Sequence, residues 1–385
     1  MTSLAPARPI DGGQPYAPLS MSMRRHVALV APPWYPVPPH GYGGIETVVA
    51  LLADELRARG HRVTLLAAEG SDRQATVHAP LAWRTDLGQR NERLRELTYA
   101  ARVLETLSRR GPFNAIHDHV GFATLLGCVH LGIAPVLHTV HGATHEPDAS
   151  FYAALGDEVG LAAISSNQRQ SAPGLPWIGT VPNAVALHHL VVGSREEKEP
   201  YLLCLARICP DKGRHLAIEV AQRTGLRLVL AGKIETTASG RDYFERHIAP
   251  ALDGDRVVHI ANVAGVAKAG LLARATALLA PIQWDEPFGL SVLEAMASGT
   301  AAISMARGAA CELIDDGQTG FLVADVDEMV AAVHSAADIE PERCAAVTRA
   351  RFSPSAMADG YLNLPGGGER PAHRRGLWRA LRDSG

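Results

Sequence analysis

The 385-residue sequence contains no apolar run of about 18 residues, the length that a membrane-spanning helix requires. It also lacks an excess of either charge, since 37 basic residues accompany 40 acidic ones. The formal net charge of -3 argues against a nucleic acid or an anionic membrane as partner. The composition that remains, 47% hydrophobic and 20% charged residues, is typical of a globular chain with a sizeable core.

Cysteines are few and scattered, at positions 128, 204, 209, 311 and 344. The pair at 204 and 209 has no second pair that would complete a zinc site. We therefore expect reduced thiols and a cytoplasmic protein. The Ala-, Arg- and Gly-rich composition suggests a bacterial source.

The two ends of the chain differ from the rest. Residues 1–23 are rich in Pro and Gly and have no apolar core, which predicts a disordered leader rather than a signal peptide. Residues 351–385 become rich in Gly and Arg, and for them we expect one short helix and a loose tail.

Short apolar strands alternate with amphipathic helices between these ends, a pattern that predicts α/β domains with parallel sheets. The pattern runs through residues 24–186, stops in the charged segment 187–200, and restarts over residues 201–350. We expect two Rossmann-like domains joined by a linker and facing each other across a cleft. Open α/β sheets bind ligands at the carboxyl ends of their strands, so the cleft is the expected site.

The segment EPFGLSVLEAMASG, residues 286–299, follows a predicted buried strand and opens a helix, with Pro287 suited to the first turn. Glu286 precedes this helix and Glu294 lies on it; for either glutamate alone, a solvated amphipathic helix is the alternative. Without a Cβ at Gly289, a phosphate can approach the backbone closely. Free N–H groups and the helix dipole predict a diphosphate site, which we place at Phe288, Gly289 and Leu290.

This segment resembles the C-terminal signature of the retaining GT-B glycosyltransferases of family 4 (glycosyltransferase group 1), in which seven residues separate two glutamates. The resemblance implies that Glu286 contacts hydroxyls of the donor sugar and that Glu294 contacts the ribose. The segment GAACELIDDGQTGFLV, residues 308–323, is similar to the Gly-rich turn, Glu-containing helix and closing strand of the same family. The resemblance also implies an N-terminal acceptor domain and a C-terminal nucleotide-sugar donor domain.

A second motif, LARICPDKG, ends the first predicted strand of the C-terminal half. Arg207 and Lys212 lie five residues apart across a loop that opens a helix, so both can reach a pyrophosphate. A surface arginine and a helix-start lysine would give the same pattern. The motif resembles the Arg/Lys pair with which the family neutralises the departing nucleotide diphosphate, in place of a metal ion.

A third motif, GYGGIE, is a glycine-rich loop between the first strand and the first helix. Its glycine spacing differs from that of the dinucleotide-binding fingerprint. It resembles the N-terminal GG loop of the family, which implies that the amides of Gly43 and Gly44 close over the donor phosphates.

Histidines gather at predicted strand ends, in the segments HDH (117–119) and HTVH (138–141). His138 and His141 cannot share one face of a strand, so these segments do not predict a metal site. By resemblance, His141 binds a hydroxyl of the donor sugar and His119 faces the acceptor side.

Three further features bear on the site. The PNA turn (182–184) resembles a P-N-G turn of the family, but Ala184 replaces the glycine and Ala186 replaces an acidic residue, which puts the local loop shape in doubt. The backbone near Val263 is expected to meet the nucleobase. Asp325 and Asp327 spell the D-x-D metal motif of another glycosyltransferase class, but a helix N-cap is the better explanation.

The resemblance implies transfer of a sugar from a nucleoside diphosphate sugar to a small-molecule or glycan acceptor, with retention at the anomeric carbon and without a cofactor. Contact between Glu294 and a ribose favours UDP or GDP. Two alternatives are a sugar-nucleotide epimerase of the same architecture, which lacks the 286–299 segment, and a pseudo-glycosyltransferase that couples a cyclitol. No oligomeric state is predicted.

Overall fold

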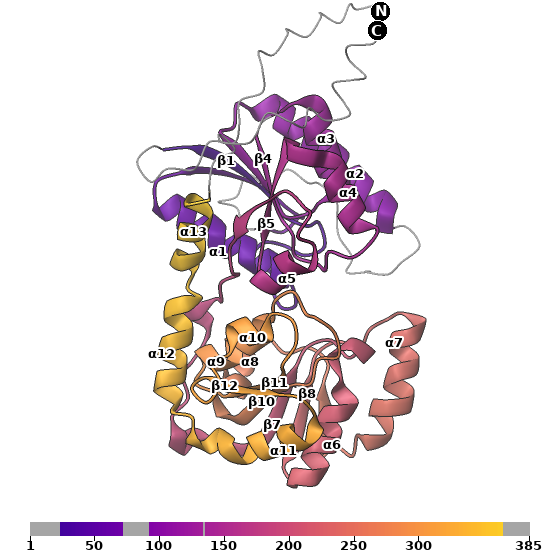
Figure 1. Ribbon diagram of the computed structural model, residues 1–385, viewed down its shortest axis with the longest axis vertical. Coiled ribbons are helices and arrows are strands. Elements are labelled where there is room, and N and C mark those ends of the chain that lie inside the picture. Colours follow the sequence, from indigo (N-terminus) through magenta and orange to yellow (C-terminus); the bar gives the residue numbers. More distant parts are fainter. Residues whose placement is uncertain (1–23, 72–91, 134, 365–385) are drawn as a thin grey trace, which may run out of the picture.

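The computed structural model describes residues 24–71, 92–133 and 135–364, which form two α/β domains (Figure 1). The expected leader 1–23 and the last residues of the expected tail, 365–385, lie outside the described residues. In the part of the chain that is described, none of the helices combines the length and the apolarity needed to cross a membrane.

The first domain is built on six parallel strands in the order β2-β1-β3-β4-β5-β6. The strands are β1 (His26–Val30), β2 (Arg62–Leu66), β3 (Ala115–Asp118), β4 (Val136–Thr139), β5 (Val159–Ala163) and β6 (Trp177–Thr180). Helices cover both faces of the sheet: α1 (Gly44–Ala58), α2 (Glu92–Arg110), α3 (Phe122–Leu131), α4 (Asp148–Leu155) and α5 (Ser166–Ser171).

The second domain repeats this plan with the strand order β12-β11-β10-β7-β8-β9. Its strands are β7 (Glu199–Leu205), β8 (Arg227–Ala231), β9 (Val257–Ile260), β10 (Ala275–Ala280), β11 (Ala302–Met305) and β12 (Gly320–Val323). Its helices are α6 (Arg214–Thr224), α7 (Ala238–Tyr243), α8 (Gly265–Arg274), α9 (Leu290–Ala297), α10 (Ala310–Leu313), α11 (Val326–Ser335) and α12 (Pro341–Arg351). The strand order reverses between β7 and β10, the place where such sheets bind ligands.

Parallel strands covered by helices on both faces are buried throughout, which explains why they are nearly continuous apolar runs. In β1, for example, the side chains from Val27 to Val30 are fully buried. The expected Rossmann-like pair of domains is therefore present. The sequence analysis did not anticipate β6, whose partly exposed residues lie at the edge of the first sheet.

The last described helix, α13 (Pro354–Leu362), returns to the first domain and packs beside α1 (Figure 1). Met357 and Tyr361 are buried in the core of that domain, and the Tyr361 hydroxyl lies 3.0 Å from Oγ1 of Thr139. Arg59, directly after α1, contacts Asp359 of α13 at 2.5 Å. The expected short helix after residue 351 thus completes the core of the N-terminal domain.

Candidate active site

One cavity of about 640 Å³ lies between the domains, at the carboxyl ends of strands from both sheets. From the first domain it is lined by the loop after β1 and by residues after β4 and β6. From the second domain it is lined by the ends of β7, β8 and β10 and by the start of α9. The cavity therefore includes the point where the strand order of the second sheet reverses.

The start of α9 lies in the wall of this cavity, but the helix begins later than the sequence suggested. Gly289, with φ 142°, is the N-cap, and Leu290 is the first helical residue. Pro287 precedes the helix, so the expectation that it occupies the first turn is wrong. The amides that open α9 are those of Gly289, Leu290 and Ser291, which lack intrahelical carbonyl partners by geometry. Phe288 also lines the cavity, with its ring buried.

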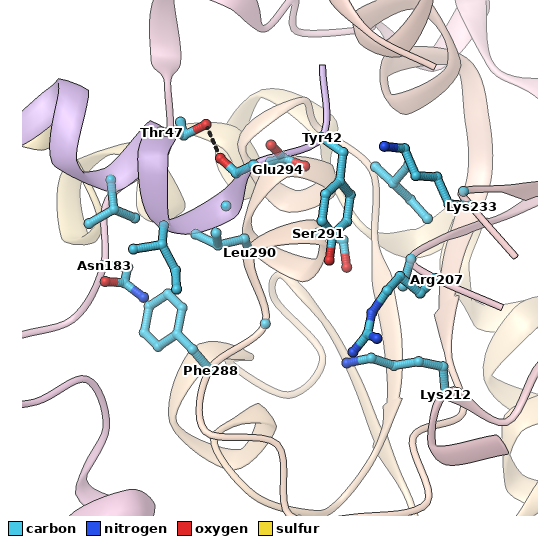
Figure 2. A pocket seen from close by; sticks show the side chains of 18 of the residues that line it. Tyr42, Thr47, Asn183, Arg207, Lys212, Lys233, Phe288, Leu290, Ser291 and Glu294 are labelled. Atoms are coloured by element: carbon cyan, nitrogen blue, oxygen red, sulfur yellow. Dashed lines mark hydrogen bonds between the residues drawn. The ribbon is translucent and has the colours of Figure 1, made fainter. Parts of the chain in front are cut away.

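Arg207 and Lys212 extend into the same cavity from the loop that follows β7 (Figure 2). A 3-10 turn over Pro210–Lys212 places the lysine near Glu286, and their side chains form an ion pair. Arg207 is about half exposed, and its ion pair with Glu235 is long, at 3.7 Å. Two cations thus face the start of α9 from one side, and Arg207 is the less tightly bound of the two.

Glu286 is held in place by the glycine-rich turn that precedes α10. A Cβ at Gly308 would lie 2.5 Å from the backbone N and O of Glu286, and φ of Gly308 is 55°. The Glu286 carbonyl accepts the N–H of Ala309 at 2.9 Å. Only glycine therefore permits this contact, which links the 308–323 segment to the position of the first glutamate.

The second glutamate, Glu294, lines the cavity and pairs with Lys268 of α8 at 2.6 Å. Val263, in the loop between β9 and α8, also lines the cavity. The residues expected to meet the ribose and the base are thus both cavity residues.

The first domain contributes the glycine loop ahead of α1. Gly43 has φ 153°, and a Cβ there would lie 2.7 Å from Cβ of Pro39. Gly44 opens α1 and faces the second domain, since its Cβ would lie 3.0 Å from Cδ1 of Leu290. The backbone of this loop therefore lies directly opposite the start of α9.

Glu46, in the same loop motif, is a cavity residue that the sequence analysis passed over. Its side chain is 4% exposed, and burial raises its pKa to about 7 despite hydrogen bonds from the N–H groups of Glu46 and Tyr35. A glutamate in the first turn of a helix is ordinarily explained by the helix dipole, so its residue type alone did not indicate a buried position.

His141 lines the cavity, whereas His119 is only 3% exposed and lies behind it. Nδ1 of His119 is 2.9 Å from Nε2 of His141. The expected place of His119 on the acceptor side stays a prediction, and the structure shows that His119 does not itself line the cavity. His138 faces the other way and contacts Asp118 at 2.7 Å and Tyr152 at 3.2 Å, as strand alternation required.

Asn183 of the PNA turn is a second missed cavity residue. It is buried, and its Oδ1 has no hydrogen-bond partner among the described residues, as is also true of Nε1 of Trp284. Buried polar groups are rarely left unpaired, so these two atoms are exceptions in the wall of the cavity. Ala184 and Ala186 follow Asn183 in the cavity wall. In the sequence, the Pro182-Asn183 pair was the feature that could have indicated this cavity residue.

Cation–π contacts between Lys233 and two tyrosines join the domains at the cavity. Nζ of Lys233, after β8, lies 5.3 Å from the ring centre of Tyr35 and 5.4 Å from that of Tyr42, both in the loop after β1. Lys233 has no carboxylate partner within the described residues. Lys233 and Tyr42, both labelled in Figure 2, line the cavity, so Lys233 is a further cation in its wall.

The D-x-D motif lies away from the cavity. Asp325 caps α11 by accepting the N–H of Glu328 at 2.9 Å, and Asp327 pairs with Arg223 at 2.7 Å. Across the described ranges, no three His, Cys, Asp or Glu residues gather as metal ligands would. The N-cap interpretation of this motif is confirmed.

Comparisons with known proteins identify the family of this chain. A family model described as "Glycosyl transferases group 1" matches residues 191–352, and one described as "Glycosyltransferase Family 4" matches residues 42–169. Phosphatidyl-myo-inositol mannosyltransferase of Mycobacterium tuberculosis is 24% identical over 329 residues, which are 77% of this chain and 82% of that protein. Trehalose synthase of Pyrococcus horikoshii is 31% identical over 146 residues, 36% of this chain but only 35% of that enzyme.

Solved structures share the fold. Sucrose-phosphate synthase from Thermosynechococcus elongatus superposes with a TM-score of 0.70 at 19% identity, covering 94% of this chain and all of that one. A glycosyltransferase involved in avilamycin A biosynthesis superposes with a TM-score of 0.64 at 24% identity, covering 88% and 98%. The two family models between them span both domains, with the Glu286 and Glu294 segment inside one and the glycine loop inside the other. The chain belongs to the GT-B glycosyltransferases of family 4, group 1.

Proposed function

We propose that this protein transfers a sugar from a nucleoside diphosphate sugar to a hydroxyl of a small-molecule or glycan acceptor. The observation that carries the proposal is that Arg207, Lys212 and the start of α9 line one cavity at the strand-order reversal of the second domain. Two cations and a helix N-terminus are the groups that stabilise a diphosphate.

UDP or GDP is the proposed donor nucleotide. Glu294 lines the cavity and is our candidate for the ribose contact, and a protein of the same fold, Anabaena HepE, was crystallised with UDP and glucose and with UDP-glucose. In this arrangement Glu286 and His141 bind the sugar and Val263 meets the base. The reduced thiols and the water-soluble class of substrate support a cytoplasmic site of action.

The proposed chemistry breaks the bond between the anomeric carbon and the diphosphate oxygen and forms a bond from that carbon to the acceptor oxygen. The acceptor proton moves to the leaving phosphate oxygen. Arg207, Lys212 and the amides of α9 stabilise the negative charge that develops on the diphosphate, so we propose a reaction that needs no metal ion. Because Glu286 is held by Lys212, it suits hydroxyl recognition better than nucleophilic attack. Front-face attack would then retain the anomeric configuration.

A donor screen followed by product analysis tests the proposal. Nucleoside diphosphates that bind the native state should raise the melting temperature, because a ligand of the folded state alone shifts the unfolding equilibrium. Donors that carry the best nucleotide are then incubated with acceptor mixtures, with and without EDTA, and products are followed by mass spectrometry and by NMR of the anomeric proton. We expect a retained configuration and full rates in EDTA.

Two outcomes would contradict the proposal. Conversion of the sugar nucleotide into an isomer without any acceptor would make the protein an epimerase. A glycosyl group trapped covalently on Glu286 would replace front-face attack by a two-step mechanism.

A further inference from the structure

Two histidines of the first domain form a hydrogen-bonded pair of which only one member lines the cavity. Nδ1 of His119, directly after β3, lies 2.9 Å from Nε2 of His141, two residues after β4. Their rings are nearly parallel, at 27°, with centres 5.2 Å apart. His119 also contacts the ring of His117, whose Nε2 is fixed by Oγ1 of Thr139 at 2.8 Å. The ring of His119 is therefore enclosed between the rings of His117 and His141.

Both members of the pair are neutral at neutral pH. Burial, followed by the nearby His138, lowers the pKa of His141 to about 3, and burial lowers the pKa of His119 well below its ordinary value. A neutral imidazole has one N–H and one bare nitrogen. The hydrogen bond between the two rings therefore contains a single proton, supplied either by Nδ1 of His119 or by Nε2 of His141.

The second ring nitrogen of His119, Nε2, shows which of the two rings carries the shared proton. Nε2 of His119 is buried and has no hydrogen-bond partner in the described part of the chain. If His141 donated the shared proton, Nε2 of His119 would have to be an N–H buried without an acceptor. Orphaned buried N–H groups are rare in native proteins. The hydrogen-bond network therefore assigns the shared proton to Nδ1 of His119, with its Nε2 left as a bare lone pair.

We propose that His119 is a positioning residue that fixes the proton of His141 on Nδ1. With its Nε2 engaged by His119, His141 has one polar atom left for a ligand, and that atom is a hydrogen-bond donor. It would therefore recognise an oxygen lone pair of the donor sugar, and not a hydroxyl hydrogen. Only this last step, the nature of the ligand, rests on the proposed function.

A matched pair of substitutions separates the tautomer from simple packing. In His119→Asn, the side-chain amide can keep an N–H at the position of Nδ1. In His119→Leu, a side chain of similar size has no donor, so His141 is free to take the Nε2–H form that imidazole favours in water. The full-length protein is labelled with ¹⁵N, and the ring signals of His141 are identified as those lost in His141→Gln.

We expect the Nδ1–H form of His141 in the wild type and in His119→Asn, and the Nε2–H form in His119→Leu. The leucine variant should lose kcat by about tenfold, the effect of one misdirected hydrogen bond, while the asparagine variant stays within about threefold of the wild type. Binding of the nucleoside diphosphate without the sugar should be equal in all three. Melting curves of both variants verify that they fold.

An Nε2–H signal for His141 in the wild type would overturn the proposal. So would asparagine and leucine variants with the same tautomer and the same kcat. The NMR result needs no substrate, so it decides the role of His119 even if no sugar nucleotide is turned over, an outcome that would count against the proposed function alone.

Discussion

The carboxylate of Glu312, on α10 in the second domain, accepts the backbone N–H of Asn167, on α5 in the first domain, at 2.6 Å. Its other oxygen accepts the N–H of Ser166 at 2.8 Å. A side chain of one domain thus caps a helix of the other. These hydrogen bonds exist only while the two domains lie as close together as they do here, an arrangement that we call closure, so they stabilise it.

Substitution of Glu312 by alanine should therefore weaken closure without harming either domain. Caps of this kind contribute about 1 kcal/mol, so KM for the donor should rise about fivefold. Asp325→Ala is the matched control, because Asp325 caps α11 within the second domain. Steady-state kinetics and the radius of gyration from small-angle scattering measure the effect. An identical rise in KM for both variants would argue against a role in closure.

Lys212→Ala should lower the rate at saturating donor by about a hundredfold or more, the usual effect of removing one donor to a developing oxyanion. The substitution also leaves Glu286, a cavity residue, without its ion-pair partner. Arg223→Ala removes a cation from the same domain at an exposed site and should leave kcat unchanged. Turnover near the wild-type value in Lys212→Ala would remove this lysine from the mechanism.

The adjacent glycines of the first domain should respond differently to alanine. At Gly43 the added Cβ would meet Pro39 at 2.7 Å with φ at 153°, so the loop must shift and kcat/KM should fall by at least about tenfold. At Gly44 the added Cβ would meet only the end of the flexible Leu290 side chain, so the loss should stay within about threefold. Each variant is the control for the other, and equal losses would contradict this explanation.

Glu46 predicts a pH dependence of stability with a definite sign. Its pKa is about 7 in the folded protein against 4.5 ordinarily, so between these values the folded state binds the extra proton. The free energy of unfolding should therefore fall as pH rises from about 4.5 to 7, by up to about 3 kcal/mol from this residue.

Glu46→Gln keeps a neutral acceptor and should remove this fall. Urea unfolding at pH 5, 6, 7 and 8 tests the difference between variant and wild type, with the exposed Glu105→Gln as control. A constant difference between the wild type and Glu46→Gln across this range would refute the assignment.

Sequence reasoning succeeded where the chemistry is local. Glu286, Gly289 and Glu294 lie on one strand–helix connection, so their spacing was enough to predict that they line the same side of a binding site. Arg207 and Lys212 were found for the same reason, and the structure brings all five to the same cavity. Their roles with a bound donor stay predictions.

The features that could not be predicted from the sequence depend on partners distant in the chain. The burial of Glu46 and the cross-domain contact of Glu312 are set by tertiary packing, which helix signals do not report. The resemblance placed His119 on the acceptor side, but its hydrogen bond to His141 joins two strands and could not be seen in the sequence. The edge strand β6 has too little burial to produce an apolar run.

The position of helix α13 at the end of the chain affects the order in which the two domains can complete their folding. The α1 face that Met357 and Tyr361 cover is synthesised at the beginning, yet its covering helix leaves the ribosome only after the entire second domain. Domains usually mature in the order of their synthesis. Here the core of the N-terminal domain can be completed only after the second domain has been synthesised.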